Sequence, residues 1–556
     1  MPGRAPSGPA KGLYVLIRPP SKTLTRLNPM TVRHTFIISS IAVPLIVFGL
    51  AQLWPPLHWL WVIIIPLVLI GYYDMLQKRR TVLRIYPVIG HIRYLFEYIR
   101  PEIQQYFVES DLNGRPIPRE FRSLVYQRAK KQEDTRPFGT IIDTYKNGYE
   151  WINYAIMPVL VAPDSLRCSF GDELCRKPYS ASPLNISAMS YGSLSKHAIL
   201  ALNRGAKLGS FFHNTGEGGL TDHHRQFGGD LVWQIGTGYF GCRDDHGNFE
   251  PESFARKASE DQVKMIEIKI SQGAKPGHGG ILPAAKVTAE ISAIRDVPMG
   301  KDVISPPAHS AFANPTELLH FIVKLRDLSG GKPVGFKLCL CNKSEFLGIC
   351  KAMFDTGITP DFITVDGGEG GTGAAPIEFT NSVGTPLREG LHFIHNALRG
   401  IGMRDRLRII AAGKSLSAYH MVRLGALGAD TVNSARGMMF ALGCIQARHC
   451  NTDKCPSGVA TQNPARYKQL DVTDKGVRVF NYHNSMIHAL ADLLGVLGVK
   501  SLTEVKPHHI NRRINSRRVT TYEEIYPELE TGFLLNDATI PQGWERDWER
   551  CSEASW

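Results

Sequence analysis

The chain has 556 residues, with 64 Lys and Arg against 51 Asp and Glu and a formal net charge of +13. This length exceeds one ordinary core, whereas an eight-stranded β/α barrel takes up about 250 residues as a single domain. The basic residues do not alternate with aromatic residues as in nucleic-acid-binding modules, so the composition argues against a nucleic-acid partner. Ten cysteines are too few for a disulfide scaffold in a chain of this length and indicate a reducing compartment.

Two apolar segments near the N-terminus predict a transmembrane helical hairpin. They cover about residues 35–53 and 57–73, are separated by Trp-Pro-Pro, and are each close to the length that crosses a bilayer. A cleaved signal peptide would instead have one short apolar run and a small-residue cleavage site. A buried helical hairpin or a re-entrant interfacial element is the alternative.

Basic residues flank this hairpin on both sides. Residues 1–34 contain six Lys or Arg and no acidic residue, and Lys78, Arg79, Arg80 and Arg84 follow the second segment. Because positive charge is retained in the cytoplasm, we expect residues 1–80 to form a basic N-terminus and an inner-membrane hairpin with both ends cytoplasmic. The catalytic part of the chain is then expected on the cytoplasmic side.

Helical periodicity predicts a helical linker or cap over residues 81–164. From 165 to 464, short apolar runs that end in glycine or polar residues alternate with helix-like stretches, which is the pattern of β/α units. Residues 465–556 form a C-terminal extension without a recognisable motif. The fold class is therefore expected to be α/β, a (β/α)8 TIM barrel, with strands at 184–189, 210–216, 231–236, 265–271, 334–340, 362–368, 407–413 and 431–437.

Functional groups of a TIM barrel lie at the carboxyl ends of its strands. These ends carry Glu217, Gln234, Lys337, Asp366, Lys414 and Arg436. Phosphate usually binds to the backbone of the loops after the seventh and eighth strands, which are AAGKS and SARGM in this chain. Gly413 and Gly437 would admit a phosphate, and Lys414 or Arg436 would supply charge. The alternative is that the two loops are only tight βα turns in which the Lys and Arg side chains are solvated.

Three cysteines form a candidate metal site. Cys444, Cys450 and Cys455 have the spacing C-x5-C-x4-C and are followed by a proline, and thiolates bind soft metals. Zinc would need a fourth ligand, which His449 could supply, and zinc sites usually contain more closely spaced cysteine pairs. The pattern favours an iron-sulfur cluster that lacks one iron over a four-cysteine cluster. Three buried structural thiols are the alternative.

Two polar runs follow predicted strands, NTGEGG (214–219) and KISQGAKPGHGG (269–280). Glu217 and Lys275 from these runs would form an acid/base pair that faces the barrel mouth. An acid among glycines is commonly a turn residue, and a lysine before proline is commonly a solvated loop cation, so a structural role is the alternative.

Six runs resemble the FMN domain of glutamate synthases in order and spacing. They are SAMSYGSLS, NTGEGGL, IEIKISQGAKPGHGG, ISPPAHS, DGGEGGTGAAP and the cysteine run that ends in CPSGVATQNP, and together they cover about residues 184–464. The resemblance implies FMN and a 3Fe-4S cluster as cofactors, and reductive amination of 2-oxoglutarate to glutamate. In that family the reduced flavin transfers a hydride to 2-iminoglutarate, and the cluster relays electrons to the flavin.

The same resemblance implies roles for individual residues. Glu217 and Lys275 match the family's active-site acid and lysine, which serve in substrate polarisation and proton transfer. Lys269 and Arg295 match groups that hold the substrate carboxylates. The flavin-binding residues are Ala188, Met189 and Ser190, which line the ring through backbone groups, Gln234, which orients it, and Lys337, which lies near its N1/O2 edge.

Departures from the family pattern bear on substrate and partners. Ile281 stands where the family has a glutamine, and Asn314 where it has a serine near the same ligand, so one substrate contact is expected to be missing. No glutaminase or nicotinamide-nucleotide domain is recognisable, so we expect ammonia to come free or from a partner. Electrons are expected to pass through a ferredoxin-like protein, a flavoprotein or a quinone.

Two other functions compete with reductive amination. The first is a membrane-bound FMN dehydrogenase that oxidises an amino or hydroxy acid and passes electrons to a quinone or partner protein. The second is a non-catalytic scaffold, which the presence of Glu217 and Lys275 argues against.

Overall fold

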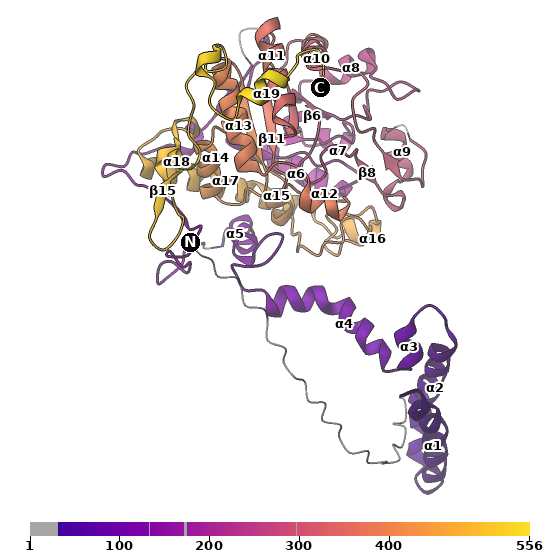
Figure 1. Ribbon diagram of the computed structural model, residues 1–556. Helices are drawn as coiled ribbons and strands as arrows, with labels where there is room; N and C mark the ends of the chain where they lie inside the picture. Colours follow the sequence, from indigo (N-terminus) through magenta and orange to yellow (C-terminus); the bar gives the residue numbers. More distant parts are fainter. Residues whose placement is uncertain (1–31, 133, 172–174, 296) are drawn as a thin grey trace, which may run out of the picture. The chain divides into compact units, whose positions relative to one another are not determined.

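The computed structural model describes residues 32–132, 134–171, 175–295 and 297–556 (Figure 1). The described residues form two compact units, which divide between Val108 and Glu109. The basic residues that precede position 32 lie outside the described residues, so their expected place beside a membrane is a prediction only.

The first unit begins with a helical hairpin. Helix α1 (Val32–Leu53), the 3-10 helix η1 (Pro55–Leu60) and α2 (Trp61–Leu76) follow one another. The rings of Phe36 and Tyr72 are 5.6 Å apart, and the Ser40 and Tyr72 hydroxyls are 2.9 Å apart, so α1 and α2 pack along part of their length. Most of their other apolar side chains are exposed.

Three helical segments in the described part of the chain are long and apolar enough to cross a membrane, by length and composition. They are Val32–Leu53, Pro55–Leu76 and Val472–Glu504. The first two agree with the predicted hairpin. The third belongs to a helix that packs on the barrel.

The helical linker is shorter than the periodicity predicted. Helices α3 (Thr81–Ile85) and α4 (Gly90–Ile103) and the π-helical turn η2 (Gln104–Val108) complete the first unit, and α5 (Arg119–Ala129) begins the second. The described residues from 130 to 162 contain no helix, because prolines and glycines interrupt this stretch. Strand β1 (Glu150–Ile152) instead pairs with β14 (Ile510–Arg513), which pairs with β15 (Val519–Thr521).

Eight parallel strands close into a barrel, in the spatial order β10-β11-β12-β13-β4-β5-β6-β7. Nearly all of their side chains are buried, since the barrel interior covers one face and helices cover the other. The predicted α/β barrel is confirmed strand by strand: β4 (Leu184–Ile186), β5 (His213–Asn214), β6 (Leu231–Ile235), β7 (Val263–Lys269), β10 (Val334–Cys339), β11 (Phe362–Asp366), β12 (Arg408–Ala412) and β13 (Thr431–Ser434).

All eight strands end earlier than predicted at their carboxyl ends. The first stops at Ile186 and the second at Asn214, although the apolar pattern extends further. Gly216 has φ +67°, a left-handed conformation that turns the chain out of the strand. The polar tails of the predicted strands are therefore loops at the barrel mouth.

Helices surround the strands, as Figure 1 shows for β6 and β11. They include α6 (Lys196–Gly209), α8 (Pro251–Ala258), α10 (Pro315–Leu328), α11 (Lys343–Thr356), α13 (Leu387–Gly400), α14 (Ala418–Ala426) and α17 (Val472–Leu497). Helix α17 lies beyond the boundary expected at 464, yet it packs closely on α6. A Cβ atom at Gly205 of α6 would lie only 2.5 Å from Val479 Cγ1 of α17.

An insertion follows β7 before α10 begins. Strand β8 (Ile281–Leu282) pairs antiparallel with β9 (Val303–Ile304), and η4 (Ala284–Lys286) and α9 (Ala289–Arg295) lie between them. The remaining short elements are β2 (Cys168–Phe170), β3 (Tyr179–Ala181), α7 (Asp222–Arg225), α12 (Ile377–Ser382), α15 (Arg436–Ala441), α16 (Pro464–Tyr467), α18 (Tyr522–Ile525) and α19 (Glu545–Arg550).

Candidate active site

Glu267 of β7 is the centre of a hydrogen-bond network inside the barrel. Its carboxylate accepts hydrogen bonds from Asn214 Nδ2 (2.8 Å) and Gln234 Nε2 (2.6 Å) at one oxygen and from Thr364 Oγ1 (2.6 Å) at the other. These donors come from β5, β6 and β11. A carboxylate that is only 1% exposed requires such partners. The network therefore fixes Gln234, one of the predicted flavin-binding residues.

Lys337 of β10 forms a second buried pair beside this network. Its Nζ lies 3.2 Å from Asp366 Oδ2 of β11, and that oxygen also accepts from the Gly273 amide (3.1 Å). Burial lowers the pKa of Lys337, but the carboxylates of Asp366 and Glu267 outweigh burial and raise the pKa above its usual value. The side chain therefore keeps its positive charge at neutral pH.

The predicted catalytic acid meets the predicted cations at the barrel mouth. Glu217 Oε1 accepts a hydrogen bond from Lys269 Nζ at 2.7 Å. Burial raises the pKa of Glu217, but Lys269, Lys275 and Arg295 together lower it below its usual value. Glu217 is thus a carboxylate near neutral pH, surrounded by three cations.

Lys275 is buried in the loop that follows β7. Burial and the like charge of Lys269 lower the pKa of Lys275 to about 8, against the opposing effect of Glu217. An amine with this pKa can both give and accept a proton near neutral pH, as acid/base catalysis requires.

Arg295 reaches the same cluster from the insertion. Its Nη2 donates to the Tyr191 carbonyl at 2.9 Å, and its guanidinium carbon lies 5.1 Å from the centre of the Phe240 ring. Burial lowers the pKa of Arg295 to about 10, and Glu217 opposes this effect. The Nε atom is buried and has no hydrogen-bond partner among the described residues. Arg295 thus offers an unused donor to an anion.

A small pocket lies beside this cluster. Its volume is about 20 Å³, and its lining includes Glu217, Thr237, Lys269, Gln272 and the loop 277–280. A Cβ atom at Gly280 would lie 2.6 Å from Glu217 Oε1, so the loop lies directly against the acid. A cavity of this size holds about one water molecule.

The predicted flavin-lining segment Ala188–Ser190 follows β4. Ala188 and Ser190 are half-buried and Met189 is buried. A Cβ atom at Gly216 would lie 2.5 Å from the Ser190 amide nitrogen, so the loop that carries Glu217 rests on this segment. The lining segment and the acid are therefore neighbours.

The two predicted phosphate loops are adjacent because β12 and β13 pair with each other. Ser434 Oγ donates to the Ser415 carbonyl at 2.7 Å and ties the loops together. Gly413 has φ +153° and Lys414 φ +34°, so the first loop needs the freedom of glycine. Ser415 Oγ is buried and has no partner in the described part of the chain. The loops therefore offer an unpaired hydroxyl beside their backbone.

Arg436 and Gly437, predicted in the second loop, are the first two residues of helix α15. Arg436 Nη2 donates to the Thr372 carbonyl at 2.7 Å, so its guanidinium is already bonded to the glycine-rich loop after β11. Lys414, by contrast, is exposed. A Cβ atom at Gly437 would lie 2.6 Å from Ser434 Oγ, which explains the glycine.

None of the three cysteines of the predicted metal site forms a disulfide with another described residue. Burial raises the pKa of Cys444 to about 11, and Cys450 and Cys455 add to this rise, so the three thiols lie within electrostatic range of one another. In the described ranges no group of three His, Cys, Asp or Glu is close enough to hold a metal ion. The side-chain positions therefore favour neither zinc nor an iron-sulfur cluster, and the prediction of a cluster rests on the spacing of the cysteines.

Lys286, which no sequence pattern predicted, is a buried cation near the cysteine run. Its Nζ donates to the Ser193 carbonyl at 2.9 Å. Burial lowers the pKa of Lys286, whereas Asp453, Cys450 and Cys455 raise it. Lys286 therefore lies between the cysteine run and the segment that follows Ser190.

Glu267 and His309 were also missed. Glu267 and Lys269 are two residues apart in one strand and so share a face, which is a signal that could have identified Glu267. His309 Nε2 lies 2.9 Å from the Lys269 carbonyl and Nδ1 lies 3.0 Å from the Tyr239 hydroxyl. Burial lowers the pKa of His309 to about 4, so the ring is neutral. No sequence pattern indicates this contact.

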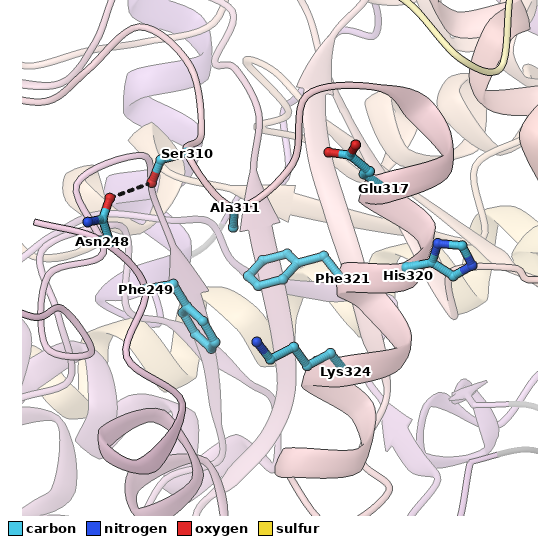
Figure 2. Close-up of a pocket in the computed structure, with 8 residues that line it drawn as sticks. All are labelled: Asn248, Phe249, Ser310, Ala311, Glu317, His320, Phe321 and Lys324. Carbon is cyan, nitrogen blue, oxygen red and sulfur yellow. Dashed lines mark hydrogen bonds between the residues drawn. The ribbon is translucent and has the colours of Figure 1, made fainter.

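A larger pocket of about 470 Å³ (Figure 2) is lined by residues of α10 and by residues 248–249 and 310–311. It shares no lining residue with the small pocket.

Asn314, expected near the substrate, is next to residues that line this larger pocket and caps α10. Its Oδ1 accepts from the Glu317 amide at 2.8 Å, and its Nδ2 donates to Glu317 Oε1 at 2.9 Å. The amide of Asn314 is therefore already used by the helix terminus.

Residues 161–500 match the family profile described as the conserved region in glutamate synthase. The chain is 37% identical over 517 residues to the glutamate synthase large subunit-like protein YerD of Bacillus subtilis, an alignment that covers 85% of this chain and 94% of that protein. It is 36% identical over 325 residues to the archaeal glutamate synthase (NADPH) of Methanocaldococcus jannaschii, covering 58% of this chain and 60% of that protein. Among solved structures, a mandelate oxidase with benzoyl-formic acid is 14% identical, with a TM-score of 0.37 and coverage of 67% of this chain and 86% of that one.

Proposed function

The chain belongs to the glutamate synthase family, and from that premise we propose that it is an oxidoreductase that uses FMN and a 3Fe-4S cluster to aminate a 2-oxo acid. The proposed substrate is 2-oxoglutarate and the product glutamate. The observation that carries this proposal is the convergence of Glu217 with Lys269, Lys275 and Arg295 beside one pocket at the barrel mouth.

The charge balance of this cluster fits a dicarboxylate. Three cations face one carboxylate, and 3 − 1 leaves an excess of two formal positive charges. Lys337 does not enter this count because Asp366 pairs with it. Two carboxylates of a bound substrate would neutralise the excess, which supports 2-oxoglutarate over an acid with a single carboxylate.

The roles of the four residues follow from their contacts. Arg295, with its unused Nε donor, would hold one substrate carboxylate, and Lys269, positioned by Glu217, would hold the other. Lys275, with its pKa of about 8, would give a proton to the substrate nitrogen. The Glu217 carboxylate would polarise the nitrogen by accepting a hydrogen bond from it.

The barrel mouth fits FMN. Ser415 Oγ, the Gly413 backbone and Lys414 would hold the phosphate. Ala188, Met189 and Ser190 would line the flavin ring, and Gln234 and Lys337 would face its polar edge from inside the barrel. When bound and reduced, FMN supplies the hydride for amination.

The spacing of the cysteine run supports an iron-sulfur cluster as the second cofactor. Cys444, Cys450 and Cys455 would be the ligands, and each thiol would lose its proton when the cluster binds. Lys286 would place a positive charge beside them, between the cluster and the flavin-lining segment.

The membrane hairpin is part of the proposal. Helices α1 and α2 are long and apolar enough to cross a bilayer, and we propose that they tether the barrel to the cytoplasmic face of the inner membrane. Reporter fusions after residues 20 and 90 of the full chain should both report cytoplasm. A periplasmic signal at either site would contradict the hairpin.

The hairpin also supports a second function, a membrane-bound FMN dehydrogenase that oxidises an amino or hydroxy acid and reduces a quinone. Ile281, in place of a family glutamine, is consistent with a substrate other than 2-oxoglutarate.

If the protein instead aminates a 2-oxo acid, as first proposed, the electrons would come from a ferredoxin-like protein or a flavoprotein.

One experiment separates the two functions. The detergent-solubilised full chain is assayed anaerobically with a panel of 2-oxo acids, ammonium and reduced methyl viologen, and separately with amino and hydroxy acids and a soluble quinone. Glutamate formed only in the first assay supports amination. Turnover confined to the second assay refutes amination and supports the dehydrogenase.

A further inference from the structure

Helix α4 (Gly90–Ile103) carries an apolar stripe that the described residues leave largely exposed. Ile92, Leu95, Phe96, Ile99 and Ile103 recur at intervals of three, one, three and four residues, which places them on one face of a helix. Leu95 and Phe96 are 56% and 58% exposed. A helix that exposes such a stripe normally covers it with another surface.

The opposite face of α4 is polar and suits water. Arg93 Nε and Glu97 Oε1 form an exposed ion pair at 3.1 Å, one helical turn apart. Residues 78–102 contain six Lys or Arg against two Glu, and 6 − 2 leaves a formal charge of +4. An anionic surface would complement this charge.

Helix α4 is fixed to the end of the membrane hairpin. Asp74 of α2 is fully buried, accepts from the Val88 amide at 3.0 Å and lies 2.9 Å from His91 Nε2. A Cβ atom at Gly90 would lie 2.8 Å from Leu83 Cδ2, so α3 and α4 also approach closely. Helix α4 therefore begins where the second apolar helix ends (Figure 1).

We propose that α4 is an interfacial helix that lies on an anionic lipid surface, with its apolar stripe among the acyl chains and its charged face in water. The inference rests on the proposed insertion of the hairpin. Two features point to lipid: the continuity of α4 with the hairpin, and the net positive charge of residues 78–102. Helix α4 would hold the residues that directly follow it, from Gln104, close to the bilayer surface.

Photo-crosslinking of the full chain tests this contact. A benzophenone amino acid replaces Phe96 on the apolar stripe, Glu97 on the polar face, or Leu45 in the middle of α1, and each protein is reconstituted in nanodiscs of phosphatidylcholine and phosphatidylglycerol. Lipid adducts at position 96 should exceed those at 97 by about tenfold, because only the stripe enters the acyl region. Omitting phosphatidylglycerol should reduce the adducts at position 96 and leave those at 45 unchanged.

The outcomes distinguish the inference from the hairpin on which it rests. Lipid adducts at position 45 with none at 96 would refute the interfacial helix and leave the hairpin intact. Absence of lipid adducts at both positions would refute both. Adducts from position 96 to the barrel or to a second chain would show that protein covers the stripe and would also refute the inference.

Discussion

Replacing Lys275 by Met should separate the catalytic role of this lysine from its cost to folding. The pKa of Lys275 is about 8, against a usual value of 10.5. The difference, 10.5 − 8, is 2.5 units, which corresponds to about 3 kcal/mol at 1.36 kcal/mol per unit. Because Lys275 is charged in both the folded and the unfolded state at pH 7, burying it lowers the free energy of unfolding by this full amount. Lys275→Met removes this cost, so we expect the variant to be at least as stable as the parent.

The pH dependence has a definite sign. Between pH 8 and 10.5 the unfolded chain binds a proton at Lys275 that the folded chain has lost, so this group makes the stability of the parent rise with pH in that window. Lys275→Met lacks this contribution. Urea denaturation at pH 7 and pH 10 would measure the change.

The effect on turnover should be opposite to the effect on stability. If Lys275 gives the substrate its proton, Lys275→Met should lower kcat by about 10²- to 10⁴-fold and leave the FMN content unchanged. The rate of the parent should fall as the pH rises through about 8, because the ammonium group is the donor. Anaerobic assays of amino-acid formation over this pH range, with FMN quantified in the same samples, would test both expectations.

Lys332 provides a matched control. It is 3% exposed, like Lys275, and burial lowers its pKa to about 8 as well. Lys332, however, lies just before the amino end of β10, and its Nζ donates to the backbone carbonyls of Ala258 and Glu260. Lys332→Met should keep kcat. Full activity in Lys275→Met, or equal loss of activity in both variants, would refute a specific role for Lys275.

Three other changes test the remaining parts of the site. Arg295→Lys should raise KM for the 2-oxo acid with little change in kcat, because lysine cannot form the guanidinium fork; an unchanged KM in steady-state assays would contradict its role in substrate binding. Cys450→Ser should lower the iron content while FMN stays bound, because the cysteine run and the phosphate loops are separate, and metal analysis with flavin absorbance would show which group is lost. Lys286→Met should lower the midpoint potential of the cluster, because a buried cation favours the more negative reduced form of the cluster. Lys286→Arg should leave the midpoint potential unchanged. A redox titration followed by electron paramagnetic resonance measures the potential, and equal potentials in both variants would argue against the charge effect.

The sequence alone determined the elements of this protein. The hairpin helices and all eight barrel strands overlap the ranges that the apolar patterns predicted, although every strand ends earlier, because helical and strand periodicity are local properties of the chain. The polar residues at the strand ends were equally predictable, since parallel strands bring their carboxyl ends to one mouth. Local pattern failed over residues 130–162, where helix-like spacing was present but prolines and glycines prevented a helix.

The tertiary structure alone decided which of these residues meet. Glu217 and Lys269 are 52 residues apart and form an ion pair, and Lys286 reaches the cysteine run from the insertion after β7. Asn314, which the sequence placed near the substrate, is bound to Glu317 at the start of α10. Periodicity says which face of a strand or helix a side chain occupies, whereas barrel closure and the path of the insertion set the distances between side chains. Hydrogen bonds and pKa shifts depend on those distances, so the chemistry of the site appears only in the folded chain.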